Sequence, residues 1–256
     1  MKLSNPIAKG NTADIYLHEN KIIKVFKDYL PETESRKEAN KQELAYSRGL
    51  PVPQVLDVTK IDGKQAIIME YITGKTLGEL FLENKEQEDY YLGLSVDIQR
   101  KIHSYKTDKI ESMYEKLQKQ IEQAPVLNIT QKINLISMLQ TMNVENALCH
   151  GDLHLFNLIM VGERITIIDW VDASSGDFRA DVYRTYLLYS QYSIDLANKY
   201  VKLYCEKSGI ERTELFRWAP IIAAARLSET VSTENTKRLL DIIASSSKYF
   251  DDGKDD

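Results

Sequence analysis

HGDLHLFN, residues 150–157, lies near the middle of the chain and places two histidines, an aspartate and an asparagine within eight positions. Asp152 precedes Asn157 by five positions. In a tight loop, this spacing can divide two tasks of phosphoryl transfer, because the carboxylate orients or accepts the proton of a substrate hydroxyl while the amide oxygen binds Mg²⁺. The stretch therefore predicts a loop that carries a base and a metal ligand.

The same eight residues allow a second interpretation as a transition-metal site. His150, Asp152 and His154 alternate as they would along a strand. A dinuclear hydrolase would need several more imidazole or carboxylate ligands, and the chain contains only four histidines. The hydrolase hypothesis is open at this point but short of ligands.

The following stretch, LIMVGERITIIDW at residues 158–170, separates the two interpretations. It consists of two apolar segments around a Gly-Glu turn and ends in Asp169 and Trp170. A phosphoryl-transfer loop needs a second acidic metal ligand after a short hairpin, and Asp169 supplies it. The loop and the hairpin together favour a kinase.

A kinase also needs an early lysine that holds phosphate. GNTADIYLHENKIIKVFK, residues 10–27, places Lys24 among four apolar neighbours on a predicted strand. Such a lysine has a face to bury and needs an anion, although on its own it is also typical of an exposed edge strand. The turn before this strand carries the single glycine Gly10, which could let the backbone approach a phosphate.

The composition of the 256-residue chain is that of an ordinary globular protein, with 43% apolar and 28% charged residues. The net charge of -5 and the lack of a Lys/Arg block argue against nucleic acid as a partner, because phosphate neutralisation needs a concentrated basic face. No apolar run approaches the roughly 20 residues that span a bilayer. MKLSNPIAKG lacks the apolar segment of a signal peptide, so we expect a cytoplasmic protein without a membrane partner.

Strand patterns cluster early in the chain and helix patterns late. Residues 13–27 and 51–72 predict hairpins, with a helix at 31–48 between them. Apolar spacing predicts helices around 94–105, 113–121, 181–193, 196–207 and 211–227. We therefore expect an α+β protein with a β-rich N-terminal lobe over 1–72, a larger, mostly helical C-terminal lobe over 73–250, and a disordered tail over 251–256.

ITGKTLGEL, residues 72–80, contains the Gly-Lys-Thr that ends a phosphate-binding P-loop. That motif needs another glycine at position 69, which is occupied by Met69. We therefore predict that this segment does not bind phosphate.

HGDLHLFN followed by IIDW resembles the catalytic and metal-binding motifs of the aminoglycoside phosphotransferase and choline kinase-like family, whose members are small-molecule relatives of the protein kinases. The resemblance extends to GNTADIY, IIKVF, GLPVPQVL and IIMEYITG, and to GDFRADVYR after the central motifs. It implies a two-lobed protein-kinase-like fold that binds ATP, with GTP as the alternative, together with Mg²⁺ and a small-molecule hydroxyl acceptor.

The resemblance also implies roles on the nucleotide side. Lys24 would hold the α- and β-phosphates and would pair with a glutamate of the 31–48 helix, for which Glu38 is favoured and Glu43, one turn away, is the alternative. The adenine pocket would be formed by the side chains of Ile22 and Met69 and by the backbone of Glu70 and Ile72.

For the chemistry, the resemblance implies that Asp152 is the catalytic base or orients the hydroxyl, and that Asn157 and Asp169 are the metal ligands. His150 would brace the catalytic loop. Asp181 would accept backbone N–H groups of that loop or cap the helix that begins there. His103, on a predicted helix, is interpreted as a packed structural histidine.

The acceptor is predicted to be a small molecule, because no Ala-Pro-Glu follows IDW and only eleven residues separate Asp169 from Asp181. Candidate acceptor residues are His154, Trp170, Asp172 and Glu229, with Asp177, Glu234, Tyr183 and Tyr186 as further possibilities. Carboxylates would suit a polycation such as an aminoglycoside, and aromatic rings a choline-like cation or a sugar. A kinase of a metabolite and a non-catalytic nucleotide sensor are the alternatives to an antibiotic kinase.

Overall fold

The computed structural model describes residues 3–143, 145–229, 231 and 233–246. The chain divides into two compact units, which are treated separately below. The first unit comprises Met1–Gln87 and Leu155–Asp172, and the second comprises Glu88–His154 and Ala173–Asp256. The predicted tail at 251–256 lies outside the described residues. Within the described part of the chain, no helix has both the length and the apolar character needed to cross a membrane.

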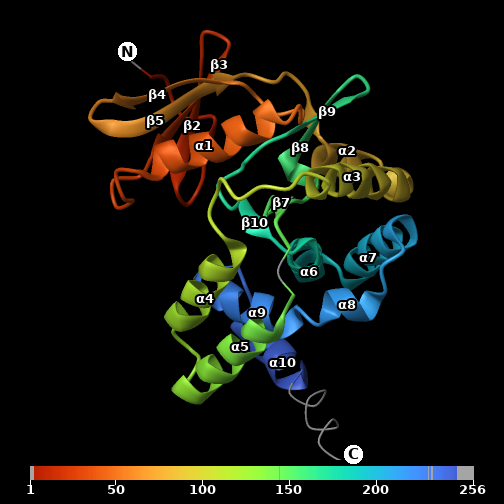
Figure 1. The fold of residues 1–256 in the computed structure, drawn as a ribbon. Helices are drawn as coiled ribbons and strands as arrows, with labels where there is room; N and C mark the ends of the chain where they lie inside the picture. Colours follow the sequence, from red (N-terminus) through yellow and green to blue (C-terminus); the bar gives the residue numbers. More distant parts are fainter. Residues whose placement is uncertain (1–2, 144, 230, 232, 247–256) are drawn as a thin grey trace, which may run out of the picture. The chain divides into compact units, whose positions relative to one another are not determined.

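The first unit is built on an antiparallel sheet with the strand order β1-β2-β3-β5-β4 (Figure 1). Both predicted hairpins are confirmed, and their tight turns use residues with positive φ, namely Glu19-Asn20 and Asp62-Gly63. The strands are β1 (Ala8–Lys9), β2 (Ala13–His18), β3 (Lys21–Phe26), β4 (Val55–Ile61) and β5 (Lys64–Glu70).

Helix α1 (Glu34–Ser47) packs on this sheet and follows Pro31 as predicted. Its sheet side is formed by buried residues at helical spacing, and Gly49, with φ of 75°, lies just beyond its end. A small core of Ala13, Phe26, Ala39 and Ile67 joins the helix to the sheet. The charged residue Glu38 lies on the same buried side of α1.

The first unit also contains segments beyond the expected lobe boundary at residues 72 and 73. Strand β6 (Lys75–Thr76) pairs with β8 (Leu158–Val161), and β8 pairs with β9 (Arg164–Ile167). Helices α2 (Leu77–Glu83), η1 (Lys85–Gln87) and η2 (Leu155–Asn157) accompany these strands. The units divide after Gln87 because the β6–β8 pairing ties the chain that follows β5 to the central hairpin.

The Gly-Lys-Thr segment has a structural role, in agreement with the rejection of a P-loop. Lys75 forms an ion pair with Glu83 at 2.7 Å. Thr76 caps α2 in a capping box with Glu79, whose N–H donates to the Thr76 hydroxyl.

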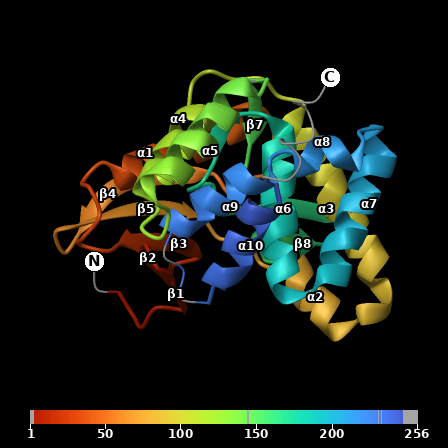
Figure 2. The ribbon, with the colours of Figure 1, turned by 90° about the horizontal axis from the view of Figure 1, so that it is seen from below.

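The second unit is mainly helical, which confirms the expected distribution of strands and helices. In both views, α4, α5, α9 and α10 form one group, and α3, α6 and α7 form another (Figures 1 and 2). Strands β7 (Ala147–Cys149) and β10 (Ser174–Gly176) pair with each other. The helices are α3 (Glu88–His103), α4 (Met113–Gln123), α5 (Ile129–Thr141), α6 (Phe178–Tyr192), α7 (Ile194–Ser208), α8 (Arg212–Phe216), α9 (Ala219–Ser228) and α10 (Thr236–Ser246).

One helix prediction needs correction. The stretch 211–227, expected as one helix, forms α8 and α9 with a break at Arg217 and Trp218. Pro220 lies in the first turn of α9, where its missing N–H costs nothing, whereas within a continuous helix it would remove a hydrogen bond.

Candidate active site

Lys24 is the centre of a charge cluster in the first unit, in which Lys24 and Glu38 are buried. Its Nζ lies 2.6 Å from Oε1 of Glu38 and 3.2 Å from Oδ1 of Asp169. Lys24 comes from β3, Glu38 from the sheet side of α1, and Asp169 follows β9. The structure pairs Lys24 with Glu38, whereas Glu43 is exposed. The Lys24 ammonium is held in place from two sides, by the carboxylate of Glu38 in α1 and by that of Asp169 after β9.

Burial and charge act on this cluster in opposite directions. Burial lowers the pKa of Lys24, but the attraction of Glu38 and Asp169 outweighs it, so the pKa lies above its usual value and the side chain remains an ammonium. Burial raises the pKa of Glu38, Lys24 opposes this rise without cancelling it, and the charge of Asp169 adds to it. Oε2 of Glu38 is buried and has no hydrogen-bond partner within the described residues. The cluster is therefore short of positive charge.

The hairpin that follows HGDLHLFN brings the two predicted metal ligands to the same end of its ladder. Leu158 pairs with Ile167, and the N–H of Ile168 donates to the carbonyl oxygen of Asn157 at 3.0 Å. Asn157 takes part in this last hydrogen bond, and Asp169 directly follows the residue that donates it. A carboxylate and an amide oxygen are ligands that Mg²⁺ prefers, and the lack of positive charge around Glu38 also suits a cation. The residues present fit a magnesium ion.

Three of the predicted adenine-binding residues lie on adjacent strands, and Ile72 follows the end of β5. Ile22 of β3 is opposite Met69 of β5, and Met69 is 9% exposed and belongs to the small core of the sheet. The N–H of Glu70 donates to the carbonyl of Gln54 at 3.0 Å. In contrast, no hydrogen bond is formed by the N–H of Ile72 within residues 3–143 or the other described ranges. The Ile72 amide is therefore the group in this segment that suits a ligand.

Gly10 lies in a turn that is closed by its own amide. The Gly10 N–H donates to the carbonyl oxygen of Ala13 at 2.8 Å, and a Cβ at position 10 would lie 3.3 Å from that oxygen. The Gly10 N–H is already used in the turn, so a phosphate would gain from the missing side chain of Gly10 and not from its amide.

The first part of HGDLHLFN belongs to the second unit and is held by Asp181 of α6. Oδ1 of Asp181 accepts the N–H of Gly151 at 2.7 Å, and Oδ2 accepts the N–H of His150 at 3.4 Å. His150 is fully buried, and its Nδ1 accepts the N–H of Asp152 at 3.3 Å. These contacts are those expected of a histidine and an aspartate that brace the loop.

Asp181 has partners that the sequence interpretation did not assign to the site. His103 places Nε2 at 2.8 Å from Oδ2 of Asp181 and Nδ1 at 3.0 Å from the hydroxyl of Tyr204, and Gln99 donates to Asp181 at 3.2 Å. Burial raises the pKa of Asp181, but His103 and the Gly151 N–H outweigh this effect, so the pKa is lowered. Gln99 and His103 are four residues apart on α3, a polar pair on one helix face that could have indicated this role.

The structure does not support the hydrolase hypothesis. His150 is fully buried and takes part in bracing the loop, while Nε2 of His154 lies 3.6 Å from Oδ2 of Asp152. In the described part of the chain, the group of histidine, cysteine and acidic residues close enough to share a metal is His103, Cys149 and Asp181. There His103 and Asp181 already bond each other, and burial raises the pKa of the Cys149 thiol, which disfavours the thiolate a metal needs.

Several predicted acceptor residues make contacts within the protein. Trp170 is fully buried and its Nε1 donates to the carbonyl of Ile167 at 3.3 Å, so its ring packs in the interior as core. Glu229 forms an ion pair with Arg184 at 2.8 Å. Asp172 is half-buried. Tyr183 and Tyr186 pack edge-on against Phe216.

The sequence matches the model of the phosphotransferase enzyme family, APH, over residues 5–216. The protein LicA homolog of Metamycoplasma hominis is 30% identical over 155 residues. The aligned stretch covers 58% of this chain and 59% of that protein, which is less than two thirds of the relative's length.

Two solved structures share the fold across almost the whole chain. Choline kinase LicA from Streptococcus pneumoniae superimposes with a TM-score of 0.66 at 17% identity, covering 96% of this chain and 94% of its own. A thermostable mutant of aminoglycoside phosphotransferase APH(4)-Ia, in ternary complex with AMP-PNP and hygromycin B, gives a TM-score of 0.65 at 14% identity, covering 96% and 91%. These similarities confirm the expected α+β, protein-kinase-like fold. Since the family model matches most of the chain, this protein belongs to the phosphotransferase enzyme family.

Proposed function

We propose that this chain is a small-molecule kinase that transfers the γ-phosphate of ATP to a hydroxyl group, with Mg²⁺ as the metal and GTP as the alternative donor. The observation that carries the proposal is the buried Lys24, 2.6 Å from Glu38 and 3.2 Å from Asp169. Asn157 and Asp169 flank the β8–β9 hairpin on its two sides. Phosphoryl transfer from a nucleotide requires a fixed cation for the phosphates and oxygen ligands for a metal ion, and Lys24, Asn157 and Asp169 are residues of these types.

In the proposed reaction, the acceptor's hydroxyl oxygen forms a bond to the γ-phosphorus. The bond between that phosphorus and the bridging oxygen of the β-phosphate breaks, so ADP leaves, and the hydroxyl proton passes to Asp152. Lys24, held by Glu38, would neutralise the α- and β-phosphates. Asn157 and Asp169 would hold Mg²⁺, which when bound supplies neutralisation of charge on the phosphate oxygens. Ile22, Met69 and the Ile72 amide would receive the base.

The charge pattern favours a small acceptor over a polycationic aminoglycoside. Of the four carboxylates considered for a polycation, Asp172 is half-buried, and the other three are paired: Asp177 with Arg179, Glu229 with Arg184, and Glu234 with Arg226 and Arg238. Carboxylates already neutralised by arginines have little charge left to offer to a ligand. We favour a choline-like alcohol or a sugar as the acceptor class, in keeping with the choline kinase LicA of Streptococcus pneumoniae, whose fold is similar.

The test is a nucleotide-consumption assay with purified protein, Mg²⁺, and ATP or GTP, over panels of choline-like alcohols, sugars and aminoglycosides. We expect one class to raise ADP release well above the slow hydrolysis to water, with phosphate found on the acceptor. Asp152→Asn should then lower kcat by roughly 100-fold or more and leave ATP affinity intact, since Asp152 acts on the hydroxyl. Asp57→Asn, at an exposed position on β4, is the matched control. ATP binding without turnover on any acceptor would instead support a nucleotide sensor.

A further inference from the structure

Helix α6 holds both polar groups of Gly151, the residue directly before Asp152. Asp181 accepts the Gly151 N–H at 2.7 Å, and Nε of Arg184 donates to the Gly151 carbonyl oxygen at 3.2 Å. Asp181 and Arg184 are three residues apart, so one face of α6 presents both. Gly151 has φ of 83°, a conformation that only glycine adopts readily. The contacts of α6 thus set the orientation of the peptide that leads into Asp152.

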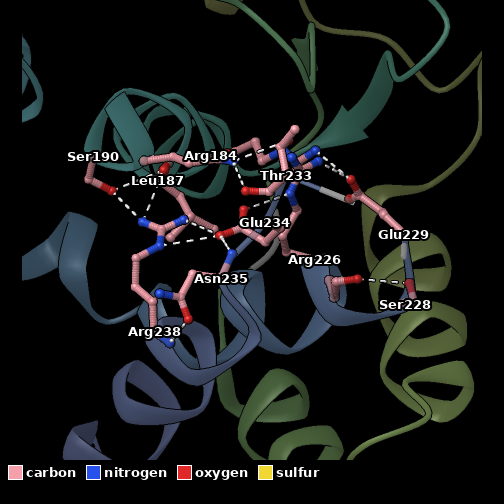
Figure 3. A network of polar contacts seen from close by, with 12 residues as sticks. Arg184, Leu187, Ser190, Arg226, Ser228, Glu229, Thr233, Glu234, Asn235 and Arg238 are labelled. Carbon is pink, nitrogen blue, oxygen red and sulfur yellow. Dashed lines mark hydrogen bonds and ion pairs between the residues drawn. The ribbon is translucent and has the colours of Figure 1, made fainter. Parts of the chain in front are cut away.

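Arg184 is itself held from the end of α9. Its Nη2 donates to Oε2 of Glu229 at 2.8 Å, and the same oxygen accepts Nη1 of Arg226 (Figure 3). The side chains of Arg184 and Glu229 are 10% and 24% exposed, so these charge-assisted bonds are partly shielded from solvent. Because the guanidinium is planar and rigid, fixing its Nη2 also fixes the direction of its Nε.

A wider cluster anchors Glu229 in turn. Nε of Arg226 donates to Glu234 at 3.2 Å, and Glu234 accepts Nη2 of Arg238 at 2.7 Å. Arg238 returns to α6, where its Nη1 donates to the hydroxyl of Ser190 at 2.8 Å and to the carbonyl of Leu187 at 3.3 Å (Figure 3). Arg184 is the member of this cluster that contacts the loop of Asp152, and Glu229 is its acidic partner.

We propose that Arg184 and Glu229 are positioning residues for Asp152: Glu229 orients the guanidinium of Arg184, which holds the Gly151 carbonyl and so fixes the backbone of the catalytic loop. The inference rests on the proposed function, in which Asp152 acts on the acceptor hydroxyl. It replaces the expectation that Glu229 binds the acceptor, since its Oε2 already faces two guanidinium groups. The end of α9 thereby contributes to catalysis through the loop.

The test compares Glu229→Gln, Arg184→Gln and the double variant with the wild-type chain. Glu229→Gln keeps the shape of the side chain and removes its charge, so we expect kcat to fall roughly 10- to 100-fold, as small misplacements of a catalytic group do, while the KM for ATP is unchanged. Because the two residues act through one contact, the kcat of the double variant should be no lower than that of the less active single variant. If Arg184→Gln does not fold, Glu229→Gln carries the test.

Arg238→Gln is the matched control. It removes contacts from the same cluster to Glu234, Ser190 and Leu187, but it leaves the Arg184–Glu229 pair in place. We expect it to lower the free energy of unfolding without lowering kcat. Equal losses of kcat in Arg238→Gln and Glu229→Gln would show a general structural role and overturn the proposal, as would a Glu229→Gln variant in which only the KM for the acceptor rises.

Amide hydrogen exchange separates this inference from the proposed function. Peptides covering residues 148–153 report on the Gly151 N–H that Asp181 accepts. We expect faster exchange there in Glu229→Gln and not in Arg238→Gln. Exchange unchanged in Glu229→Gln would overturn the inference even if the chain is a kinase. A wild-type chain without acceptor-dependent turnover would overturn the proposed function, and the exchange measurement would still decide whether Glu229 holds the loop.

Discussion

At the scale of single residues, the backbone of Asp169 is unusual. Its φ is 63°, in the left-handed region that aspartate tolerates better than most non-glycine residues. Such a conformation costs on the order of 1 kcal/mol and persists where the surrounding structure enforces it. Here it accompanies the contact of the carboxylate with Lys24 at 3.2 Å. The sequence identified Asp169 as a ligand type, but it did not predict this conformation.

The buried Lys24–Glu38 pair leads to a prediction on stability. In Lys24→Met, Glu38 is left buried without its cation, and we expect the free energy of unfolding at pH 7 to fall by about 3–5 kcal/mol. Adding Glu38→Gln to Lys24→Met should recover part of the loss, because no charge then remains buried. Urea unfolding of the two single variants and the double variant measures the coupling. A loss that is the same with and without Glu38→Gln would contradict the prediction.

Lys27→Met is the control for this pair. Lys27 lies 2.6 Å from Asp14, but both side chains are more exposed than those of the buried pair. A solvent-accessible pair contributes about 0–1 kcal/mol, so the free energy of unfolding of Lys27→Met should be close to that of the wild-type chain.

The Lys24→Met variant should also regain stability as the pH falls, since burial raises the pKa of Glu38 and the folded state then favours the protonated form.

At the scale of elements, helix α2 constrains the segment that carries Asn157. Gly78 is buried in the first turn of α2, and a Cβ there would lie 2.6 Å from the ring of Phe156. Phe156 is adjacent to Asn157 in the 3-10 helix η2. The close approach of α2 to η2 therefore depends on the missing side chain of Gly78 and sets where Asn157 begins the hairpin.

We predict that Gly78→Ala impairs metal use more than it impairs folding. The added methyl group meets the ring of Phe156, which must shift, and we expect the adjacent Asn157 to shift with it. Changes next to metal ligands typically lower metal affinity roughly 10-fold. The concentration of Mg²⁺ needed for half-maximal turnover should rise accordingly. Gly93→Ala in α3 is the control, because its Cβ would meet nothing closer than Nζ of Lys207 at 3.9 Å. A magnesium requirement that is equal in both variants would refute the role assigned to α2.

At the scale of the whole molecule, the division between the two compact units falls within the proposed catalytic motif. The chain passes from the second unit to the first between His154 and Leu155, inside HGDLHLFN itself. The residue before Asp152 is bound by Asp181 of α6, which is in turn bound by His103 of α3, whereas the segment of Asn157 lies against α2 and the β8–β9 hairpin. In the proposed reaction, the second unit would therefore position the residue that accepts the hydroxyl proton, and the first unit would position the metal ligands.

The charge cluster of the second unit predicts how stability depends on pH. Burial raises the pKa of Glu234, but Arg238 and Arg226 outweigh it, so the folded-state pKa is lowered. Glu234 therefore contributes stability above its unfolded pKa, and this contribution is lost as the pH falls through the folded value. Glu234→Gln should cost about 1–2 kcal/mol at pH 7, and the difference from the wild-type chain should shrink at pH 3.

Urea unfolding at both pH values measures this difference. Asp241→Asn serves as the control, because its pair with Lys237 is an exposed pair within α10 and contributes only about 0.3–0.5 kcal/mol. A difference between Glu234→Gln and the wild-type chain that persists unchanged at pH 3 would contradict the assigned pKa shift.

The sequence alone determined the class of chemistry and most of the elements. Asp152, Asn157, Asp169 and Lys24 could be identified because local spacing fixes which residue types share a loop, a hairpin or a strand. Their role in this chain is proposed, whereas the hairpins and the α+β, protein-kinase-like fold are confirmed by the structure. Hydrophobic periodicity and turn residues act over a few positions, so they reveal elements without showing which distant elements meet.

The tertiary structure alone decided how distant charges are paired. In the structure, Lys24 pairs with Glu38 and not with Glu43, and His103 lies within hydrogen-bond distance of Asp181. Trp170 is buried, and Glu229 pairs with Arg184 instead of being available to a ligand. Each choice joins residues far apart in the chain, where the free energy depends on burial and on the partner across the fold. A carboxylate on a helix has the same local sequence signature whether it faces water, an arginine or a substrate.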